Sequence, residues 1–262
     1  MSFRALILLL GCISLDAAEE ELDPLVIKAE EEESLVPGAS ISLDREEIEN
    51  SNAGTVAELL EFEAGLPFTS FFGTPGLGSP IIRGFAENSS SRTLVLVDGL
   101  PVARPDLGVA PWFQFPVNSL ERVTLLRGSR TVRYGSRALG GVIAMETRRP
   151  THKPAATAEI AAAGIDTFRF RIFGGMPVRD WGLTLSAEDE RSDGYRDNSA
   201  YRTTAGTIAL ESPQDAPLSA RWTLSANDLF YENPGALSTA RYHEDPTQSI
   251  YEVFGVGDQY FN

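Results

Sequence analysis

The sequence predicts an α+β domain followed by the first antiparallel strands of a larger sheet or barrel. Between Ser34 and Pro150, short β-rich runs are mixed with segments that have helix-capping residues at their starts. From Ala155 onward the pattern changes to an alternation of apolar and polar residues, which fits a sheet that covers a core or a barrel wall. In this second part short connections alternate with long polar ones, and this alternation is typical of a membrane β-barrel.

The first eighteen residues have the layout of a secretory signal peptide. Arg4 precedes a short apolar core, and small residues follow it near Ala17. The core is shorter than the roughly 20 apolar residues that a membrane-spanning helix needs. Leu9–Cys12 also resembles a site at which a lipid is attached to cysteine, and both kinds of leader predict export. Export favours a barrel over a soluble β-sandwich for the second part of the chain.

Acidic residues are concentrated near the N-terminus. The net charge is −15, and Asp16–Glu63 holds sixteen acidic residues against two basic ones, so the rest of the chain is nearly neutral. We expect Glu19–Glu33 to be a solvated tail. Its apolar triplet Leu25–Ile27 is a candidate for pairing with the sheet edge of another protein. The sequence has no basic stripe, so nucleic acid is not expected as a partner.

Helix signals follow a first strand in the α+β domain. Ser40–Leu43 alternates as a strand does, and Asp44 is placed to cap a short helix over Arg45–Asn50. Thr55 and Glu58 have the spacing of a capping box before an apolar run. These signals predict two short helices in succession.

Three further strands are expected in the same domain. Thr93–Val97 is a β-rich run that ends at Asp98–Gly99, a strong turn dipeptide. Leu120–Leu126 and Gly140–Met145 are the other two candidates. With the two helices, these strands predict a mixed α/β domain that ends near Pro150.

The second part of the chain contains four segments in which apolar and polar residues alternate. These segments are Phe168–Ile172, Trp181–Glu188, Thr207–Leu210 and Arg221–Asn227. We expect short, turn-like connections at Gly174–Asp180 and Ser212–Pro217, and long polar ones at Glu190–Arg202 and Pro234–Ser249.

Several motifs follow one another in a fixed order along the chain. They are Ile82–Phe85 (IRGF), Leu94–Gly99 (LVLVDG), Leu120–Gly128 (LERVTLLRG), Tyr134–Gly135 and Leu139–Ile143 (LGGVI). In this order they closely resemble the plug domain of TonB-dependent outer-membrane receptors. Upstream, Glu46–Ile48 and Thr55–Leu60 match the start of such a plug, and Asp193–Asn198 resembles the first long loop of the barrel around it. One departure is Ser129, at a position where the family often has proline.

The resemblance implies a transmembrane β-barrel with an α+β plug domain ahead of its first strands. It divides the chain into a signal peptide (1–18), a periplasmic tail with a TonB box (19–33), a plug domain (34–150) and the N-terminal part of the barrel (151–262). Such barrels have about 22 strands of roughly 10 residues. The chain is therefore expected to be an N-terminal fragment of a longer receptor, through truncation or an incomplete gene model.

The resemblance also assigns functional residues. The TonB box, the segment through which the inner-membrane TonB complex would pull, corresponds to Asp23, Pro24, Leu25, Val26, Ile27, Lys28 and Ala29. The plug loops that rise to the ligand in similar receptors correspond to Ser70–Ser79 and Ala103–Phe115, with Phe71, Phe72, Arg104, Asp106, Trp112 and Phe113 as candidate contacts. The aromatic side chains in these loops also fit a simpler role, in which they pack the plug against the barrel wall. Arg83 and Arg127 correspond to arginines that pair with barrel glutamates and lock the plug in place.

The implied function is active uptake of a scarce ligand, a ferric siderophore or cobalamin, across the outer membrane. Haem is less favoured because the plug loops have no histidine to serve as an axial ligand. Three alternatives remain open: a plug-like module that only senses ligand, a truncated receptor that does not transport, and a soluble secreted β-rich protein. An enzyme is not expected, since no nucleophile elbow, phosphate-binding loop or dinucleotide fingerprint occurs and His152 and His243 lack metal-ligand spacing. No cofactor or bound metal is expected either.

Overall fold

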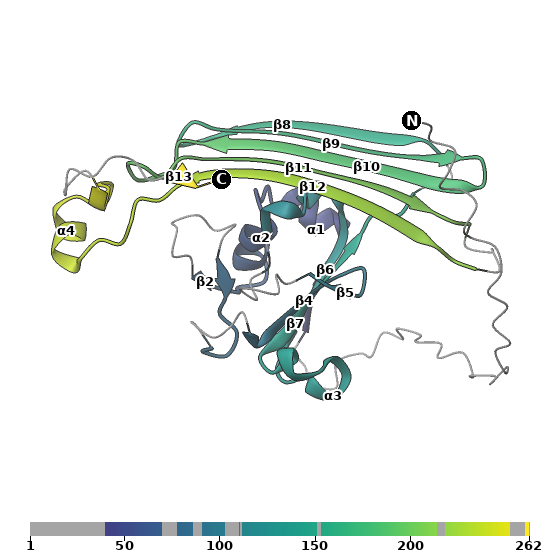
Figure 1. Ribbon diagram of the computed structural model, residues 1–262, viewed down its shortest axis with the longest axis horizontal. Coiled ribbons are helices and arrows are strands. Elements are labelled where there is room, and N and C mark those ends of the chain that lie inside the picture. Colours follow the sequence, from purple (N-terminus) through teal and green to yellow (C-terminus); the bar gives the residue numbers. More distant parts are fainter. Residues whose placement is uncertain are drawn as a thin grey trace, which may run out of the picture. The chain divides into compact units, whose positions relative to one another are not determined.

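Two sheets, one mixed and one antiparallel, account for most of the strands (Figure 1). The computed structural model describes residues 40–69, 78–85, 91–102, 110, 112–150, 153–213, 218–251 and 260–261. Both sheets belong to one unit that begins at Val36. We call them the first sheet and the second sheet, in chain order.

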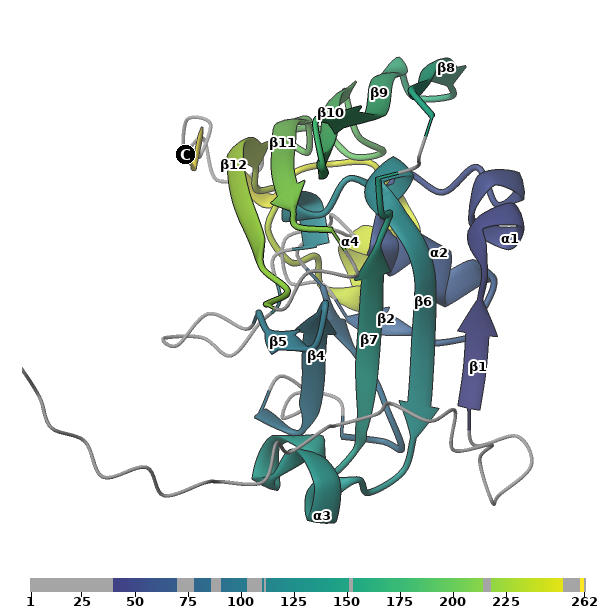
Figure 2. The same ribbon diagram turned by 90° about the vertical axis from the view of Figure 1, so that its right-hand side faces the viewer.

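The first sheet has the strand order β1-β6-β7-β4-β5. Its strands are β1 (Ser40–Leu43), β4 (Thr93–Val97), β5 (Leu100–Pro101), β6 (Leu120–Arg127) and β7 (Gly141–Thr147). Only the β4–β7 pair is parallel, and the other pairs are antiparallel. Figure 2 shows β1, β6, β7 and β4 side by side. Two short strands, β2 (Phe68–Thr69) and β3 (Ser79–Pro80), pair separately.

The helices of this part are short and lie between the strands. They are α1 (Arg45–Asn50), α2 (Val56–Phe62), α3 (Thr131–Tyr134) and the 3₁₀ turns η3 (Trp112–Gln114), η4 (Val117–Ser119) and η5 (Ser136–Ala138). The apolar faces of α1 and α2 pack on β6 and β7, with Ile48, Leu59, Leu60, Val123 and Ile143 buried in one cluster. This packing stabilises helices that would be marginal in isolation.

Local capping explains where α1 and α2 begin. The Asp44 carboxylate accepts from the Glu47 backbone N–H, and the Glu47 carboxylate accepts from the Asp44 N–H, so both halves of a capping box are present. Thr55 caps α2 by accepting from the Glu58 N–H. The Glu58 carboxylate, however, accepts from Gly54 rather than from Thr55, so this capping box is displaced by one residue.

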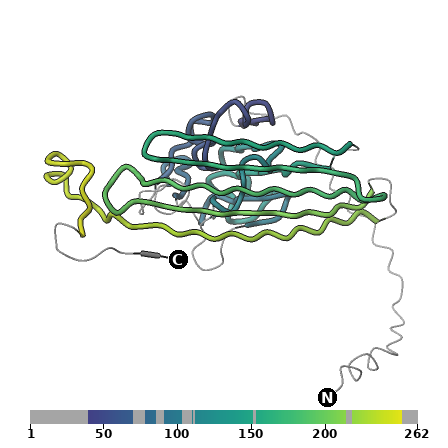
Figure 3. The backbone as a smooth tube through the Cα atoms, turned by 90° about the horizontal axis from the view of Figure 1, so that it is seen from above, coloured from purple at the N-terminus to yellow at the C-terminus, as the bar shows by residue number. Residues whose placement is uncertain are grey.

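The second sheet is antiparallel throughout. Its order is β13-β12-β11-β10-β9-β8, and its strands are β8 (Ala155–Ala163), β9 (Thr167–Val178), β10 (Trp181–Ser192), β11 (Tyr201–Glu211), β12 (Arg221–Glu232) and β13 (Tyr260–Phe261). Figure 3 shows β8 to β12 running side by side. The expected order of a mixed domain followed by antiparallel strands is confirmed.

Two connections of the second sheet are shorter than the sequence predicts. The long connection expected at Glu190–Arg202 is reduced to residues 193–200, because β10 continues to Ser192 and β11 begins at Tyr201. The segment 174–180 was expected to be a connection, but β9 continues to Val178 because Gly174–Val178 pairs with β10. The turn is reduced to Arg179 and Asp180. Alternation alone did not reveal this continuation because two glycines interrupt the apolar pattern.

The two faces of the second sheet have different side chains. Pairing places Arg169, Arg171 and Phe173 opposite Glu190, Glu188 and Ser186, so these charged and polar groups share one face. The opposite face carries apolar side chains that are at least 38% exposed: Ile160, Phe170, Met176, Val178, Leu185, Ile208, Trp222 and Leu224. Near the ends of β10 and β12 on that face, Trp181 and Trp222 stack with their ring centroids 5.3 Å apart.

Within the described part of the chain, no helix combines the length and the apolar character that a membrane crossing requires.

Candidate functional site

Two arginine–glutamate pairs on the charged face of the second sheet form a cluster with a tyrosine. Arg171 Nε donates to Glu188 Oε2 at 2.6 Å, and Arg169 Nε donates to Glu190. Tyr201 Oη donates to Glu190 Oε1 at 2.6 Å. The four charged side chains are between 1% and 11% exposed, so the ion pairs lie away from bulk water. We call these five residues the wall cluster.

The wall cluster holds the turn that precedes α2. Arg171 Nη2 donates to the carbonyl oxygens of Ala53 and Gly54, at 3.0 and 2.6 Å. Arg169 Nη1 donates to the Asn52 carbonyl at 3.4 Å. An arginine carries five N–H donors in a planar fork, so Arg171 binds its glutamate and these carbonyls at the same time.

The side chains of Arg169 and Glu58 approach Gly54 closely. A Cβ atom at this position would lie 2.1 Å from Arg169 Nη2 and 2.8 Å from Glu58 Oε2. Glu58 Oε2 also accepts from the Gly54 N–H at 2.7 Å. Burial raises the pKa of Glu58, and Glu190 raises it further, while the Gly54 hydrogen bond and Arg169 act in the opposite direction.

A second group of polar contacts joins the end of the first sheet to β11 and β12. Asp98, in the turn after β4, accepts from the Thr147 N–H and hydroxyl at 2.9 and 2.7 Å. Arg221 donates to the Thr147 hydroxyl at 2.6 Å and lies 3.7 Å from Asp98. Arg149 and Arg221 both pair with Glu211, at 2.5 and 3.0 Å. We call these five residues the exit cluster, because the chain leaves the first sheet here.

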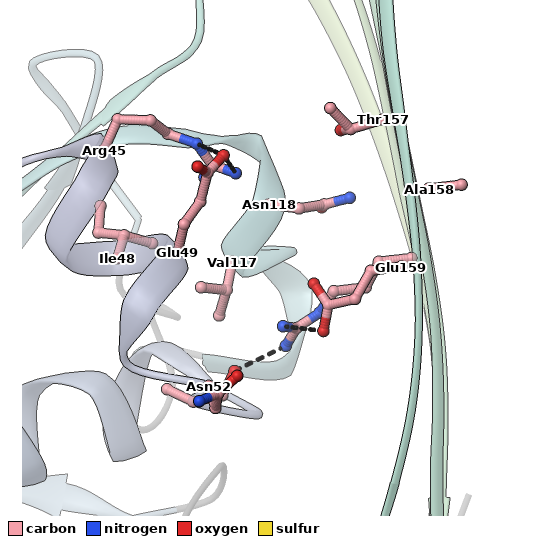
Figure 4. A pocket seen from close by; sticks show the side chains of 11 residues that line it. Arg45, Ile48, Glu49, Asn52, Val117, Asn118, Thr157, Ala158 and Glu159 are labelled. Carbon is pink, nitrogen blue, oxygen red and sulfur yellow. Dashed lines mark hydrogen bonds and ion pairs between the residues drawn. The ribbon is translucent and has the colours of Figure 1, made fainter.

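A cavity of about 290 Å³ lies between α1 and η4 on one side and the second sheet on the other (Figure 4). Figure 4 shows Arg45 and Glu49 of α1 on one side and Thr157 and Glu159 of β8 on the other. Asn118 lies between them, and its buried Oδ1 has no hydrogen-bond partner within the described residues. The lining is therefore polar and can hold water. The described residues contain no group of three or more His, Cys, Asp or Glu side chains placed to hold a metal ion.

Residues 32–142 match the family described as TonB-dependent Receptor Plug Domain. This range contains β1, β4, β5, β6 and the start of β7, together with α1 and α2. The chain contains a TonB-dependent receptor plug domain. The plug is followed by the antiparallel strands of the second sheet, and the TonB-dependent transporter family is non-enzymatic.

Relatives of known function cover more of the chain than the plug. The vitamin B12 transporter BtuB of Vibrio cholerae serotype O1 is 28% identical over 233 residues, which are 83% of this chain and 37% of the transporter. BtuB of Photobacterium profundum is 31% identical over 188 residues, which are 68% of this chain and 30% of the transporter. The chain thus spans well under half the length of these relatives.

Solved structures share the fold of the plug and the second sheet. The unliganded ferric citrate transporter FecA superimposes with a TM-score of 0.65 at 24% identity, covering 81% of this chain and 34% of that one. The copper transporter OprC gives a TM-score of 0.62 at 20% identity, with 76% and 32% covered.

The predicted ligand contacts fall partly within the described residues. Trp112 is fully buried, donates from Nε1 to the Gly78 carbonyl at 2.8 Å and meets the Phe68 ring edge to face. Phe113 is buried, with its ring 5.5 Å from that of Tyr201. Both side chains thus pack within the plug or against the second sheet, and ligand contact stays a prediction. The remaining candidates, namely Phe71, Phe72, Arg104, Asp106 and the TonB box Asp23–Ala29, lie outside the described residues.

Arg83 and Arg127 make contacts inside the plug. Arg127 Nη2 donates to the carbonyl oxygens of Ala64 and Gly65, at 2.5 and 3.4 Å, just beyond the end of α2. Arg83 is exposed, and its guanidinium lies against Gly128. A lock between these arginines and barrel glutamates stays a prediction.

Sequence reasoning did not identify the wall cluster. A signal was present, because Arg169 and Arg171 are two residues apart, as are Glu188 and Glu190, so each pair occupies one face of its strand. The register between β9 and β10 was needed to place the pairs opposite each other. Periodicity does not supply that register.

Proposed function

We propose that this chain is the N-terminal part of an outer-membrane receptor that imports a scarce ligand with energy supplied through TonB. In this proposal residues 1–18 are a signal peptide, 19–33 a periplasmic tail, 34–150 the plug and 151–262 the first part of the barrel. The observation that carries the proposal is a plug domain bound to the charged face of an antiparallel sheet whose other face is apolar.

The two faces of the second sheet support a place in the membrane. An apolar outer face suits lipid, and the stacked pair Trp181–Trp222 suits the boundary between lipid and water, where aromatic residues gather in barrels. The charged inner face carries the wall cluster, which binds the plug through backbone carbonyls. These contacts would hold the plug as a seal until force is applied.

The TonB box is proposed at Asp23–Ala29. An extended segment adds to the edge of a partner's sheet through backbone hydrogen bonds, and Pro24 limits where that pairing begins because it lacks an N–H donor. Force on this segment reaches the plug first at β1, an edge strand of only four residues.

The ligand is proposed to be of the cobalamin or ferric siderophore class. The likeness to the two vitamin B12 transporters supports cobalamin, and the fold shared with the ferric citrate transporter supports an iron chelate. Uptake of vitamin B12 and of ferric citrate, measured in cells that produce the full-length receptor, separates the two classes.

Transport is tested by substituting Val26→Pro in the full-length receptor. Proline removes a backbone donor from the box, so uptake of the transported probe should fall to the level of cells without TonB, while binding of the probe to intact cells is retained. Glu31→Pro, in the tail beyond the box, is the matched control and should transport normally. Uptake by Val26→Pro at the unsubstituted rate would contradict the TonB box.

A sensing module without transport predicts a different result. It would bind the probe at the cell surface, and no uptake would follow in the presence of TonB. The same outcome is expected of a truncated receptor, which would in addition fail to form a closed barrel.

A further inference from the structure

Arg196 lies in the connection between β10 and β11 and binds the connection that follows β12. Its Nη1 donates to the Gly235 carbonyl at 2.7 Å, and its Nη2 donates to the carbonyls of Gln248 and Pro234 at 2.9 and 3.3 Å. Its Nε donates to Gln248 as well, at 3.3 Å. Three of its nitrogens therefore bind the main chain of a segment that lies 38 to 52 residues further along.

Neighbouring residues strengthen this contact between the two connections. The Asp197 N–H donates to the Thr247 carbonyl at 2.8 Å, and Asn198 Nδ2 donates to the Asn233 carbonyl at 2.8 Å. Burial lowers the pKa of Arg196, and the nearby Asp197 acts in the opposite direction. A charged side chain that is partly withdrawn from water needs such a set of acceptors.

Both connections are shaped by glycines at positive φ. Gly194 has φ +75°, and a Cβ atom there would lie 2.3 Å from the Ser199 carbonyl oxygen. Gly235 has φ +69°, and a Cβ atom there would lie 2.0 Å from Ile250 Cγ2. Only glycine fits these two positions, so each connection has a defined conformation at the point where they meet.

Gln248 links Arg196 to helix α4 (Thr239–Glu244). Its main-chain carbonyl accepts from Arg196, and its side-chain Nε2 donates to the carbonyls of Arg241 and Asp245, each at 2.9 Å. The end of α4 is thus capped by the residue that Arg196 holds. Ser238 caps the start of the helix by accepting from the Arg241 N–H.

We propose that Arg196 is a positioning residue that joins segments 193–200 and 233–250 into one rigid unit and thereby fixes α4. In an ordinary pair of loops, each would move independently. Here α4 has a set position before any ligand arrives, which lowers the ordering cost of a contact made by its exposed face. That the unit faces the outside of the cell rests on the proposed function, but its rigidity does not.

The distance between spin labels tests this inference without ligand or transport. Tyr195→Cys and Ala240→Cys place labels at exposed positions of the two segments in the full-length receptor. With Arg196 present, the labels should give one narrow distance distribution. Arg196→Ala should raise the undocked population by about tenfold or more, because several bonds from one charged donor are lost together. Arg196→Lys should also broaden the distribution, since an ammonium lacks the planar fork.

Two further variants, Arg202→Ala and Gln248→Ala, serve as the control and as an independent test of the link to α4. Arg202→Ala removes a neighbouring exposed arginine that pairs with Asp189, and it should leave the distribution narrow. Gln248→Ala keeps the carbonyl that Arg196 binds but removes the cap of α4, so it should broaden the distance with Arg196 intact. The inference is overturned if the unsubstituted receptor already gives a broad distribution, or if both Arg196→Ala and Gln248→Ala stay as narrow as Arg202→Ala.

Discussion

Several arginines in the described part of the chain donate to main-chain carbonyls of segments distant in sequence. Arg127 binds the residues after α2, Arg171 binds the turn before α2, and Arg196 binds the segment that carries α4. Hydrogen bonds from an ionised donor are stronger than bonds between neutral groups. Because the acceptors are backbone groups, their positions follow from the fold and not from the identity of the side chains there.

Loss of Arg171 should strongly weaken the hold of the second sheet on the plug. Arg171→Ala leaves Glu188 buried without its partner, which costs about 3–5 kcal/mol of unfolding free energy. Arg202→Ala breaks the exposed pair with Asp189 and should cost at most about 1 kcal/mol. Denaturant unfolding of the full-length receptor measures both, and equal losses in the two variants would refute a special role for Arg171.

Glu58 should make the plug more stable at lower pH. Its pKa is raised by burial and by Glu190, against the Gly54 hydrogen bond and Arg169, so the native plug binds a proton more readily than the unfolded chain does. The unfolding free energy should therefore fall as pH rises through the range above the ordinary value of 4.5. Glu58→Gln should abolish this dependence of the unfolding free energy on pH, while Glu61→Gln, in the same helix, should retain it. If the unfolding free energy of the wild-type protein rose with pH over this range, Glu58 could not be the group that controls it.

At the scale of elements, the helix starts and the strands of the plug follow from local signals. Asp44, Thr55 and the Asp98–Gly99 turn predicted where elements begin or end, because capping and turn chemistry act over a few residues. The length of β9 and the wall cluster depend instead on the register between β9 and β10. Register is set by partners far along the chain, which explains why these features required the structure.

The capping box of α1 gives an element-scale prediction. Asp44→Ala removes the acceptor of the Glu47 N–H and should lower the unfolding free energy by about 1 kcal/mol. Glu46→Ala, in the same turn but outside the box, should cost only a few tenths of that amount through the helix dipole. Thermal unfolding of the two variants in parallel checks the difference, and equal shifts would show that the box does not set the start of α1.

At the scale of the whole molecule, β8 forms an edge of the second sheet. Within the described residues, β8 pairs with β9 on one side only. In lipid, unpaired backbone N–H and C=O groups at such an edge are too costly to persist, so a membrane-embedded sheet closes into a barrel. Our account therefore requires strands from elsewhere in the receptor to pair with β8 and to close the wall around the plug.

The central claim is that the second sheet is the start of a closed barrel around the plug. It is tested most directly by sequencing the gene past the codon for Asn262. The account predicts an open reading frame that continues through many more strands of alternating apolar and polar residues, enough to close a barrel and pair with β8. A stop codon directly after Asn262 would contradict it, because the described strands alone cannot enclose the plug in a membrane.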